Sequence, residues 1–434
     1  MIFNQIGPKF EGYLSTGTKM SKVIAVLKAI SVTGVNSEDI SKALICWDET
    51  AMDSANFCLK SINDQFSSEF VENLRIALIE YNSAPQTSLN SCLKALEALV
   101  DLPASTQLNP DFFQNLRVAF LEFESAPETS LNCCLKAFES LSPLSQAPEE
   151  EADKFQNLRI AFLESIEDPK QALNLILKVI ETLPEFSIVS DLRKGFLSFE
   201  EKSELESINH FLRYFGELEK SPFISDIRKS IQKFPQANWA DAFSFGQIQS
   251  KVWLIEEWSK LKLPLPKMSF ILGGWYGLLA ALAEARNQAL SEKYRSFDVD
   301  AECTLIADSI NKTLLLNDWK FKATTEDMHK INYHGHDYHT LKSDGSEVRL
   351  IESPDLIINT SCEHIGHFSE WYATIPDGTT LILQSNDFFD EATHINCSKN
   401  LQEFQSQCKM SKVLFAGEKE FPLYKRFMLI GIKS

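Results

Sequence analysis

Four groups of residues in this chain have types and spacings that could support chemistry. The first is a glycine cluster, Gly273, Gly274 and Gly277, which follows the apolar run 268–272 and precedes a helical pattern. Glycines let the backbone approach a ligand closely, and the helix after them offers free N–H groups and a positive dipole end. A strand that ends at glycines and continues into a helix is therefore typical of a nucleotide-binding turn.

This turn has other interpretations. The uncharged run 268–283 has 16 residues and is interrupted by Gly-Gly, whereas a membrane span needs about 20 apolar residues. The turn does not match the GxGxxG pattern of a dinucleotide site. A buried strand and helix without any ligand stays open as an alternative.

The second and third groups lie at the ends of other predicted strands. Asp298 ends the stretch 293–298, and Asp327 follows the strand 319–324. Open α/β sheets bind ligands beyond the carboxyl ends of their strands. Two further strands end in polar residues, with the sequences Asn359-Thr360-Ser361-Cys362-Glu363-His364 and Gln384-Ser385-Asn386-Asp387.

Within the first of these polar ends, Glu363 and His364 are candidate bases. The pKa of an unperturbed histidine lies closest to neutrality, which favours His364 as the residue that accepts a proton. The alternatives are that residues 361–364 only cap the following helix, or that Cys362 is a nucleophile.

A histidine cluster, His334, His336 and His339 with Asp337, has the HxH spacing of some metal sites. Distant His394 or Cys397 could complete such a site. A polar loop at the base of an inserted hairpin is the favoured interpretation, so no metal is expected.

Strands and helices alternate from residue 239 to the C-terminus, which predicts a doubly wound, mostly parallel sheet. The expected strands are 268–272, 293–298, 319–324, 355–359, 379–384, 412–416 and 426–432. The expected helices are 247–261, 278–283, 301–315, 365–373 and 401–410. Residues 338–351 form an inserted hairpin, and the last two strands form a closing hairpin that makes the final strand antiparallel.

This order resembles the seven-stranded fold of class I S-adenosylmethionine-dependent methyltransferases, a Rossmann-like family. The markers are the glycine turn, Asp298 at the end of strand two, an acid after strand three and the terminal hairpin. The resemblance implies that S-adenosylmethionine is the cofactor and that Asp298 accepts its ribose hydroxyls. It assigns the cofactor contacts to Gly273, Gly274, Trp275, Tyr276, Gly277, Asp298, Asp327, Met328 and Thr360. Two positions depart from the family pattern, since Ile271 stands where an acid is usual and Trp275 replaces a glycine.

The first half of the chain is repetitive. The motif Asn-Leu-Arg-Ile/Val-Ala recurs at a spacing of 42 residues, starting at Asn73, Asn115 and Asn157. In each unit a proline lies twelve residues later, where it can end one helix and open the next. The sequence therefore predicts an α-solenoid of helix pairs over residues 1–238, followed by the methyltransferase domain 239–434.

An arginine recurs in these units, at Arg75, Arg117, Arg159 and Arg193. These side chains could pair with acids of the same region, such as Glu80 and Glu122. They could instead line a groove that holds an acidic partner.

Composition limits the classes of function. The formal net charge is −18, which leaves no basic surplus for broad binding of a nucleic acid backbone. Nine cysteines without CxxC pairs indicate free thiols in a reducing compartment. The first 19 residues lack a continuous apolar stretch, so no signal peptide is expected. We expect a cytoplasmic protein that binds neither membrane nor nucleic acid.

The sequence thus predicts an enzyme that transfers a methyl group from S-adenosylmethionine to a nitrogen or oxygen acceptor. The substrate is unidentified, and a peptide or protein held by the helical repeats is one class. A catalytically inactive Rossmann-like scaffold is the rival that Ile271 and Trp275 favour. Transfer of the aminocarboxypropyl group from the same cofactor and an NAD-linked oxidoreductase are further alternatives.

Overall fold

The computed structural model describes residues 22–99 apart from 82, scattered residues between 114 and 136, and residues 154–434 apart from 166 and 343. Contacts divide the chain into two compact units. One unit is helical and spans 35–220, and the other holds 221–434 together with helix α2 (Lys22–Ser31). The boundary between the units at 220 therefore precedes the boundary at 238 that the sequence predicts.

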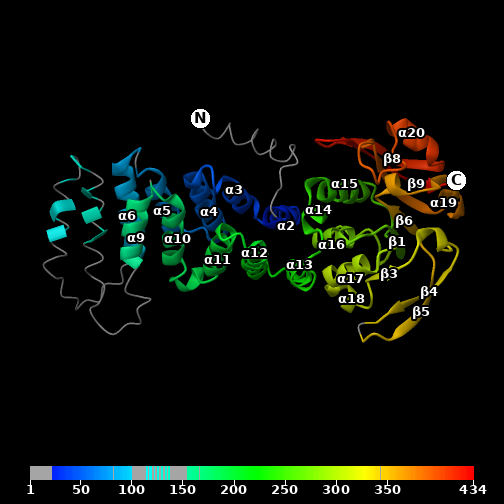
Figure 1. The fold of residues 1–434 in the computed structure, drawn as a ribbon, viewed down its shortest axis with the longest axis horizontal. Coiled ribbons are helices and arrows are strands. Elements are labelled where there is room, and N and C mark those ends of the chain that lie inside the picture. The colour runs from blue at the N-terminus through cyan, green and yellow to red at the C-terminus, as the bar shows by residue number, and fades with distance from the viewer. Residues whose placement is uncertain are drawn as a thin grey trace. The chain divides into compact units, whose positions relative to one another are not determined.

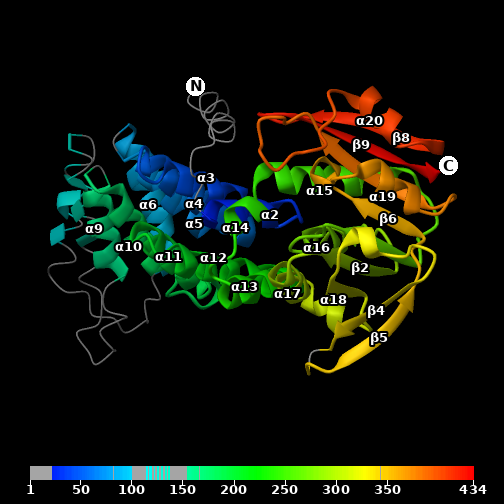
Figure 2. The same cartoon turned by 45° about the vertical axis from the view of Figure 1, so that its right-hand side comes forward.

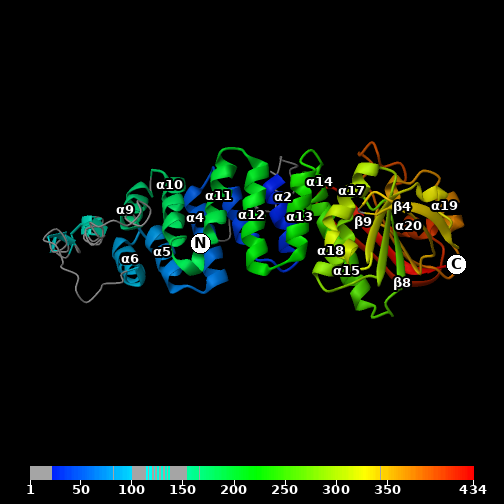
Figure 3. The same cartoon turned by 90° about the horizontal axis from the view of Figure 1, so that it is seen from below.

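The helical unit consists of helices that pack in consecutive pairs. They are α3 (Glu38–Cys46), α4 (Ala51–Phe66), α5 (Glu69–Ile79), α6 (Pro85–Leu99), α9 (Lys154–Glu164), α10 (Pro169–Ile180), η1 (Pro184–Phe186), α11 (Val189–Glu200) and α12 (Glu204–Glu219). Helix α3 packs on α4, α5 on α6, α9 on α10 and α11 on α12, and successive helices lie side by side in Figures 1 and 3. Pro85 and Pro169 each open the second helix of a pair, which confirms the predicted helix pairs.

A continuous solenoid stays a prediction, because its middle part, including the linkers 101–109 and 142–151, lies outside the described residues. The repeat itself recurs as a hydrogen bond between paired helices. The Ser88 hydroxyl donates to the carbonyl of Ala77, and the Ser130 hydroxyl donates to the carbonyl of Ala119. The two serines are 42 residues apart, and so are the two alanines. This hydrogen bond therefore recurs with the same spacing as the sequence motif.

Two of the repeated arginines form ion pairs inside the helical unit. Arg75 pairs with Glu72 on the same helix, and Arg193 donates to both carboxylate oxygens of Glu181 at 2.9 and 2.7 Å. The acids that the sequence suggests as partners have other roles. They accept hydrogen bonds from nearby serines, Glu80 from Ser83 and Glu122 from Ser125.

The second unit is built on a seven-stranded sheet with the order β3-β2-β1-β6-β7-β9-β8. The strands are β1 (Met268–Leu272), β2 (Lys293–Asp298), β3 (Phe321–Thr325), β6 (Leu356–Asn359), β7 (Thr380–Asn386), β8 (Met410–Glu420) and β9 (Lys425–Lys433). The first five are parallel, and β9 runs antiparallel to both β7 and β8. This confirms the predicted Rossmann-like sheet with its closing hairpin, seen at the right of Figure 2.

Helices cover both faces of this sheet. They are α14 (Trp239–Ala242), α15 (Phe245–Lys260), α16 (Leu278–Ala285), α17 (Ala301–Ile310), α18 (Lys312–Leu316), η3 (Cys362–His364), α19 (Phe368–Thr374) and α20 (Leu401–Gln407). Helix α13 (Pro222–Lys233) packs on α17 and α18, and α2 packs on α14 and α15, so both belong to this unit. The predicted helix 301–315 is interrupted at Asn311, whose amide donates to the carbonyls of Gly277 and Ala307.

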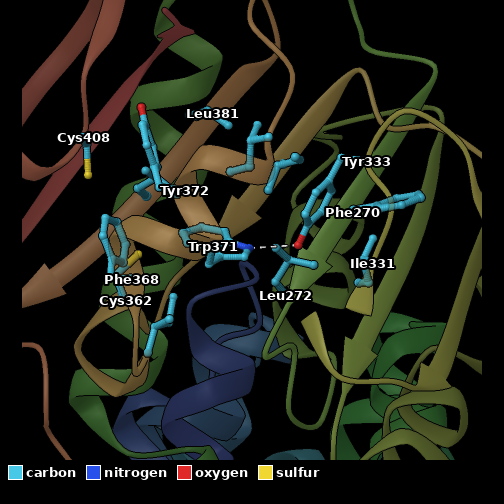
Figure 4. Close-up of a cluster of buried hydrophobic side chains, with 14 of the residues drawn as sticks. Phe270, Leu272, Ile331, Tyr333, Cys362, Phe368, Trp371, Tyr372, Leu381 and Cys408 are labelled. Carbon is cyan, nitrogen blue, oxygen red and sulfur yellow. Dashed lines mark hydrogen bonds between the residues drawn. The ribbon is translucent and has the colours of Figure 1, made fainter. Parts of the chain in front are cut away.

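One face of the sheet carries the apolar cluster of Figure 4. Phe270 and Leu272 of β1 point into it, as the alternation of side chains along a strand requires. The Trp371 indole N–H donates to the Tyr333 hydroxyl at 2.9 Å, and this hydroxyl donates to the carbonyl of Met328 at 3.0 Å. The buried cluster therefore holds the turn η2 (Met328–Lys330) in place after β3.

A hairpin of β4 (His336–Leu341) and β5 (Glu347–Glu352) is inserted after β3, as predicted. Arg295 of β2 donates to both carboxylate oxygens of Glu352 at 2.7 and 2.8 Å, and the Tyr338 hydroxyl donates to the same carboxylate at 2.6 Å. The Arg295 side chain is only 4% exposed. A buried, bidentate ion pair therefore fastens the hairpin to the sheet.

The histidine cluster 334–339 is distributed along this hairpin. His336 is buried and stacks on Tyr338, with ring centroids 4.9 Å apart, while Asp337 pairs with Arg349. Within the described part of the chain, these histidines do not converge as a group of metal ligands.

The uncharged run 268–283 is divided between β1 and α16. Among the described residues, no helix combines the length and the apolar character that crossing a membrane requires.

The ion pair of the inserted hairpin gives a stability prediction. Arg295→Leu removes the partner of the largely buried Glu352, and breaking a buried pair in this way costs about 3–5 kcal/mol of unfolding free energy. Arg349→Leu is the matched control, because its pair with Asp337 crosses the same hairpin but is solvated, with side chains 60% and 44% exposed. Urea unfolding should show a large loss for the first variant and little change for the second. Equal losses would contradict the role given to Arg295.

Candidate functional site

The glycine turn after β1 is held against the end of β2. The N–H groups of Gly273 and Gly274 both donate to the carbonyl of Phe297, at 2.9 and 3.2 Å. Gly273 has φ +61°, and a Cβ added there would meet no atom within 4 Å, so this position faces open space. Gly277 has φ +68° and directly precedes α16. The turn thus presents its backbone at the N-terminal end of a helix, where an anionic or polar ligand is favoured.

Gly274 lies in the most crowded position of the turn. A Cβ added to it would come within 2.0 Å of the Ser296 hydroxyl oxygen. Ser296 is buried in β2, so glycine here allows the first turn to pack tightly on the second strand.

Asp298 ends β2 and supports the same turn. Its carboxylate accepts the N–H of Trp275 at 2.9 Å and the N–H of Asp300 at 3.1 Å. A carboxylate offers about four lone-pair sites, so further hydrogen bonds from a ligand can be accepted. The side chain is half-buried, which leaves it reachable from solvent.

The two aromatic residues of the turn differ in their surroundings. Tyr276 is buried, its ring lies 5.4 Å from that of Trp239, and its hydroxyl accepts the N–H of Asn238 at 3.1 Å. Trp275 is half-buried and adopts φ +47°, a conformation that favours glycine. Tyr276 therefore anchors the turn to α14, while Trp275 remains at its surface.

The other predicted cofactor residues lie at neighbouring strand ends. Asp327 accepts the N–H of His329 at 3.0 Å and so caps η2. The Met328 sulfur lies 3.9 Å from the side-chain nitrogen of Asn359, the last residue of β6. Thr360 comes next, and its carbonyl accepts a hydrogen bond from Arg426 at 2.8 Å. The structure thus brings the predicted residues to one edge of the sheet.

A chamber of about 510 Å³ opens beyond the carboxyl ends of β6 and β7. Its lining comes from the segments 240–247, 361–364, 386–394 and 421–426, which include Asp241, Glu363, His364, His394, Tyr424 and Arg426. Ser361 belongs to this lining, and its N–H donates to the side chain of Asn359 at 2.8 Å. Asn359 therefore connects the chamber to the turn that carries Met328.

Glu363 forms the buried end wall of the chamber. Its side chain is 2% exposed, and its Oε1 accepts hydrogen bonds from Asn386 at 2.8 Å and from Arg426 at 3.1 Å. The Oε2 atom has no hydrogen-bond partner among the described residues. Burying a carboxylate is costly unless a cation is paired with it, and Arg426 is that cation here.

Two histidines stand beside this carboxylate. His364 Nδ1 lies 3.0 Å from the carbonyl of Thr393, and His394 Nδ1 lies 3.0 Å from the carbonyl of Phe388. A carbonyl only accepts, so each Nδ1 donates its N–H to that carbonyl. The ring centroids are 4.5 Å apart, and burial lowers the pKa of His394 below its ordinary value. The two rings are thus fixed by their Nδ1 contacts, and Nε2 is the remaining nitrogen of each ring.

Desolvation also shifts the pKa of other groups around the chamber, including Asp241, which is exposed as a residue. Burial raises the pKa of Asp241, and burial together with Arg426 lowers the pKa of Lys251 to about 7. Cys362 is fully buried, and this burial raises the pKa of its thiol well above the ordinary range. A thiol that is buried and protonated is a poor nucleophile, so Cys362 is not the reacting group.

The sequence predicts Glu363 and His364 as bases, names His394 only as a distant candidate for a metal site, and assigns no contact with Glu363 to Asn386, His394 or Arg426. Asn386 was visible as part of a polar strand end. Arg426 was visible only as a charge at the start of an apolar strand, and His394 lay in a loop without a recognisable pattern. Long-range contacts bring these residues to Glu363, and no local spacing predicts them.

No family model matches this chain, and no curated protein matches it in sequence. Among solved structures it is similar to the N-methyltransferase NodS from Bradyrhizobium japonicum WM9, at 10% identity and TM-score 0.30, over 43% of this chain and 94% of that chain. The magnesium protoporphyrin IX methyltransferase of Synechocystis PCC 6803 is similar at 14% identity and TM-score 0.28, over 49% and 85%. A sarcosine dimethylglycine methyltransferase assigned in Galdieria sulphuraria is similar at 10% identity and TM-score 0.32, over 47% and 91%.

The close approach of Gly274 to Ser296 gives a prediction on the turn. Gly274→Ala should lower the unfolding free energy by about 1–3 kcal/mol, since an extra methyl group in a packed position forces neighbours to move. The same change in a Ser296→Ala background should cost clearly less, because the hydroxyl that it meets is gone. Thermal or urea unfolding of the native protein, the two single variants and the double variant gives the coupling free energy between the two positions. Additive effects would show that the two residues do not constrain each other.

Proposed function

We propose that this protein transfers a methyl group from S-adenosylmethionine to a nitrogen or oxygen acceptor held in the chamber. The observation that supports this most is a continuous edge of one sheet. It carries an open glycine turn after β1, a reachable carboxylate on Asp298 after β2 and, beyond the ends of the next strands β6 and β7, a chamber that ends at Glu363.

The residues present fit the cofactor. Gly273 leaves open space beside the turn, the N-terminal end of α16 offers partial positive charge, and Asp298 keeps lone pairs for the ribose hydroxyls. Gly273, Gly274 and Gly277 would hold its methionine part, while Asp327, Met328 and Thr360 would border the rest. S-adenosylmethionine supplies, when bound, a methyl group activated by a positively charged sulfur.

The chain's own groups would bind and orient the acceptor. The chamber walls would cover part of it, and the fixed dipoles and charges there would orient it. The Nδ1 atom of His364 is held by the Thr393 carbonyl, so its Nε2 would be the nitrogen that receives the N–H or O–H hydrogen of the acceptor. Glu363, held by Arg426 and Asn386, gives the end wall a fixed negative charge.

The class of acceptor is not set by these features. A peptide or protein held by the helical repeats, the expectation from the sequence, stays part of the proposal. Transfer of the aminocarboxypropyl group would use the same glycine turn. Analysis of the product distinguishes it from methyl transfer.

Cofactor binding is tested by calorimetry with S-adenosylhomocysteine on the full chain. Asp298→Ala should weaken binding strongly, because hydrogen bonds to a charged group contribute about 1.5–3 kcal/mol each. Asp355→Ala is a matched control at the opposite edge of the sheet, where Asp355 also accepts two backbone N–H groups, from Lys267 and Met268. The control should bind as the native protein does. Tight NADH binding, with none for S-adenosylhomocysteine, would contradict the proposal.

The role of His364 is tested by turnover. His364→Ala should lower methyl transfer about 10²–10⁴-fold, the usual contribution of a general acid or base, while leaving S-adenosylhomocysteine affinity nearly unchanged. Labelled S-adenosylmethionine with cell extract as the source of acceptor provides the assay. A variant that methylates at the native rate would remove His364 from the reaction.

A further inference from the structure

Three potential metal ligands converge at the end wall of the chamber. A carboxylate oxygen of Glu363 and one ring nitrogen each of His364 and His394 lie within 4.8 Å of one another. They come from η3 after β6 and from the loop after β7, so the fold and not a local motif brings them together.

One oxygen of the Glu363 carboxylate accepts hydrogen bonds, and the other has no hydrogen-bond partner among the described residues. Arg426 and Asn386 both bond to Oε1, whereas Oε2 is buried without a hydrogen-bond partner among the described residues. Leaving a buried charged oxygen unpaired is costly. A cation bound at Oε2 would remove this cost.

Both histidines have the arrangement that orients an imidazole toward a metal. Their Nδ1 atoms are held by the carbonyls of Thr393 and Phe388. Metal-binding histidines commonly donate their other N–H to a carbonyl or carboxylate, which fixes the tautomer and the ring orientation. With Nδ1 held in this way, Nε2 is the nitrogen of each ring that would bind a cation beside the Glu363 carboxylate.

The two segments that carry these ligands are fastened to each other. The backbone N–H of Asn396 donates to the carbonyl of Glu363 at 2.8 Å, and its side-chain amide donates to the carbonyl of Cys362 at 3.1 Å. The backbone N–H of Ser398 donates to the carbonyl of Asn386 at 3.0 Å. The loop of His394 is thus positioned before any ligand binds, as a metal site requires.

We propose that Glu363, His364 and His394 bind a divalent first-row transition metal ion. Two imidazole nitrogens and one carboxylate oxygen suit zinc, manganese, iron(II) or cobalt, whereas magnesium and calcium prefer oxygen ligands alone. Three protein ligands with an open position are typical of metal sites that bind a substrate or water. This site differs from the cluster 334–339 that the sequence suggests, and it replaces the expectation that no metal is held.

Metal binding by these residues is independent of the proposed methyl transfer. A role of the bound metal in the reaction rests on that proposed function. An open coordination position in the chamber would take an oxygen atom of the acceptor, which narrows the acceptor class to one with a hydroxyl or similar oxygen. His364 would then act as a ligand instead of the proton acceptor. The cation would lower the pKa of an acceptor hydroxyl, whose proton would be lost to water before methyl transfer.

The test is cobalt(II) titration of the full chain after treatment with a chelator, followed by visible d–d absorption and calorimetry. The native protein should bind one cobalt(II) with a spectrum typical of nitrogen and oxygen ligands, and zinc should displace it. His394→Ala and His394→Gln should each weaken the affinity more than about 100-fold, since changes to residues that merely support a ligand already cost about 10–100-fold. His367→Ala is the control, because this nearby histidine is exposed and pairs with the exposed Glu370.

Circular dichroism of the variants shows whether they fold, and the two substitutions at His394 differ in size so that one folded variant suffices. No cobalt binding by the native protein, or equal binding by a folded His394 variant, would overturn the site. Calorimetry with S-adenosylhomocysteine on the metal-free protein separates the two proposals. If S-adenosylhomocysteine binds and cobalt(II) does not, only the metal site is contradicted. If cobalt(II) binds and S-adenosylhomocysteine does not, only the cofactor proposal is contradicted.

Discussion

Parallel pairing of β1, β2, β3, β6 and β7 is the constraint on which the site depends. The register places Leu272 beside Phe297 on one side and beside Asn359 on the other. The residues that follow β1, β2 and β6 therefore start from neighbouring positions, with adjacent strands about 4.8 Å apart across the sheet. A glycine turn, a carboxylate and a polar strand end from distant parts of the chain become one edge. No segment could build this edge alone, because each contributes only the residues at the end of its own strand.

The antiparallel last strand adds a charge that the parallel strands cannot supply. A strand that runs in the opposite direction begins where the parallel strands end, and the register pairs Arg426 with Asn386 at this edge. Arg426 can then reach the Glu363 carboxylate, and a buried acid at the end of the chamber keeps a compensating charge. The closing hairpin is therefore more than a topological marker. It supplies the guanidinium that allows Glu363 to be buried beside His364 and His394.

Most of the sheet was predictable because its apolar runs are short and end at glycine or acidic residues. The helix 301–315 was wrong in one respect, since the tertiary bonds of Asn311 interrupt it and sequence periodicity does not register such bonds. The same limit applies to the site. Asp298 and Glu363 lie at strand ends, where the sequence predicts functional side chains, whereas Arg426 and His394 reach the chamber through long-range pairing and loop packing. Histidines close in sequence, at 334–339, drew attention to metal chemistry, but in the fold they are spread along a hairpin.

The central claim is that one edge of the sheet holds a sulfonium cofactor beside the acceptor chamber. A crystal structure of the full chain with S-adenosylhomocysteine tests it most directly. The account predicts ligand density over Gly273–Gly277, with the ribose hydroxyls on Asp298 and the sulfur directed toward the chamber of Glu363 and Arg426. Crystals grown with saturating ligand that show this turn and Asp298 free of it, or the ligand bound at another part of the chain, would contradict the account.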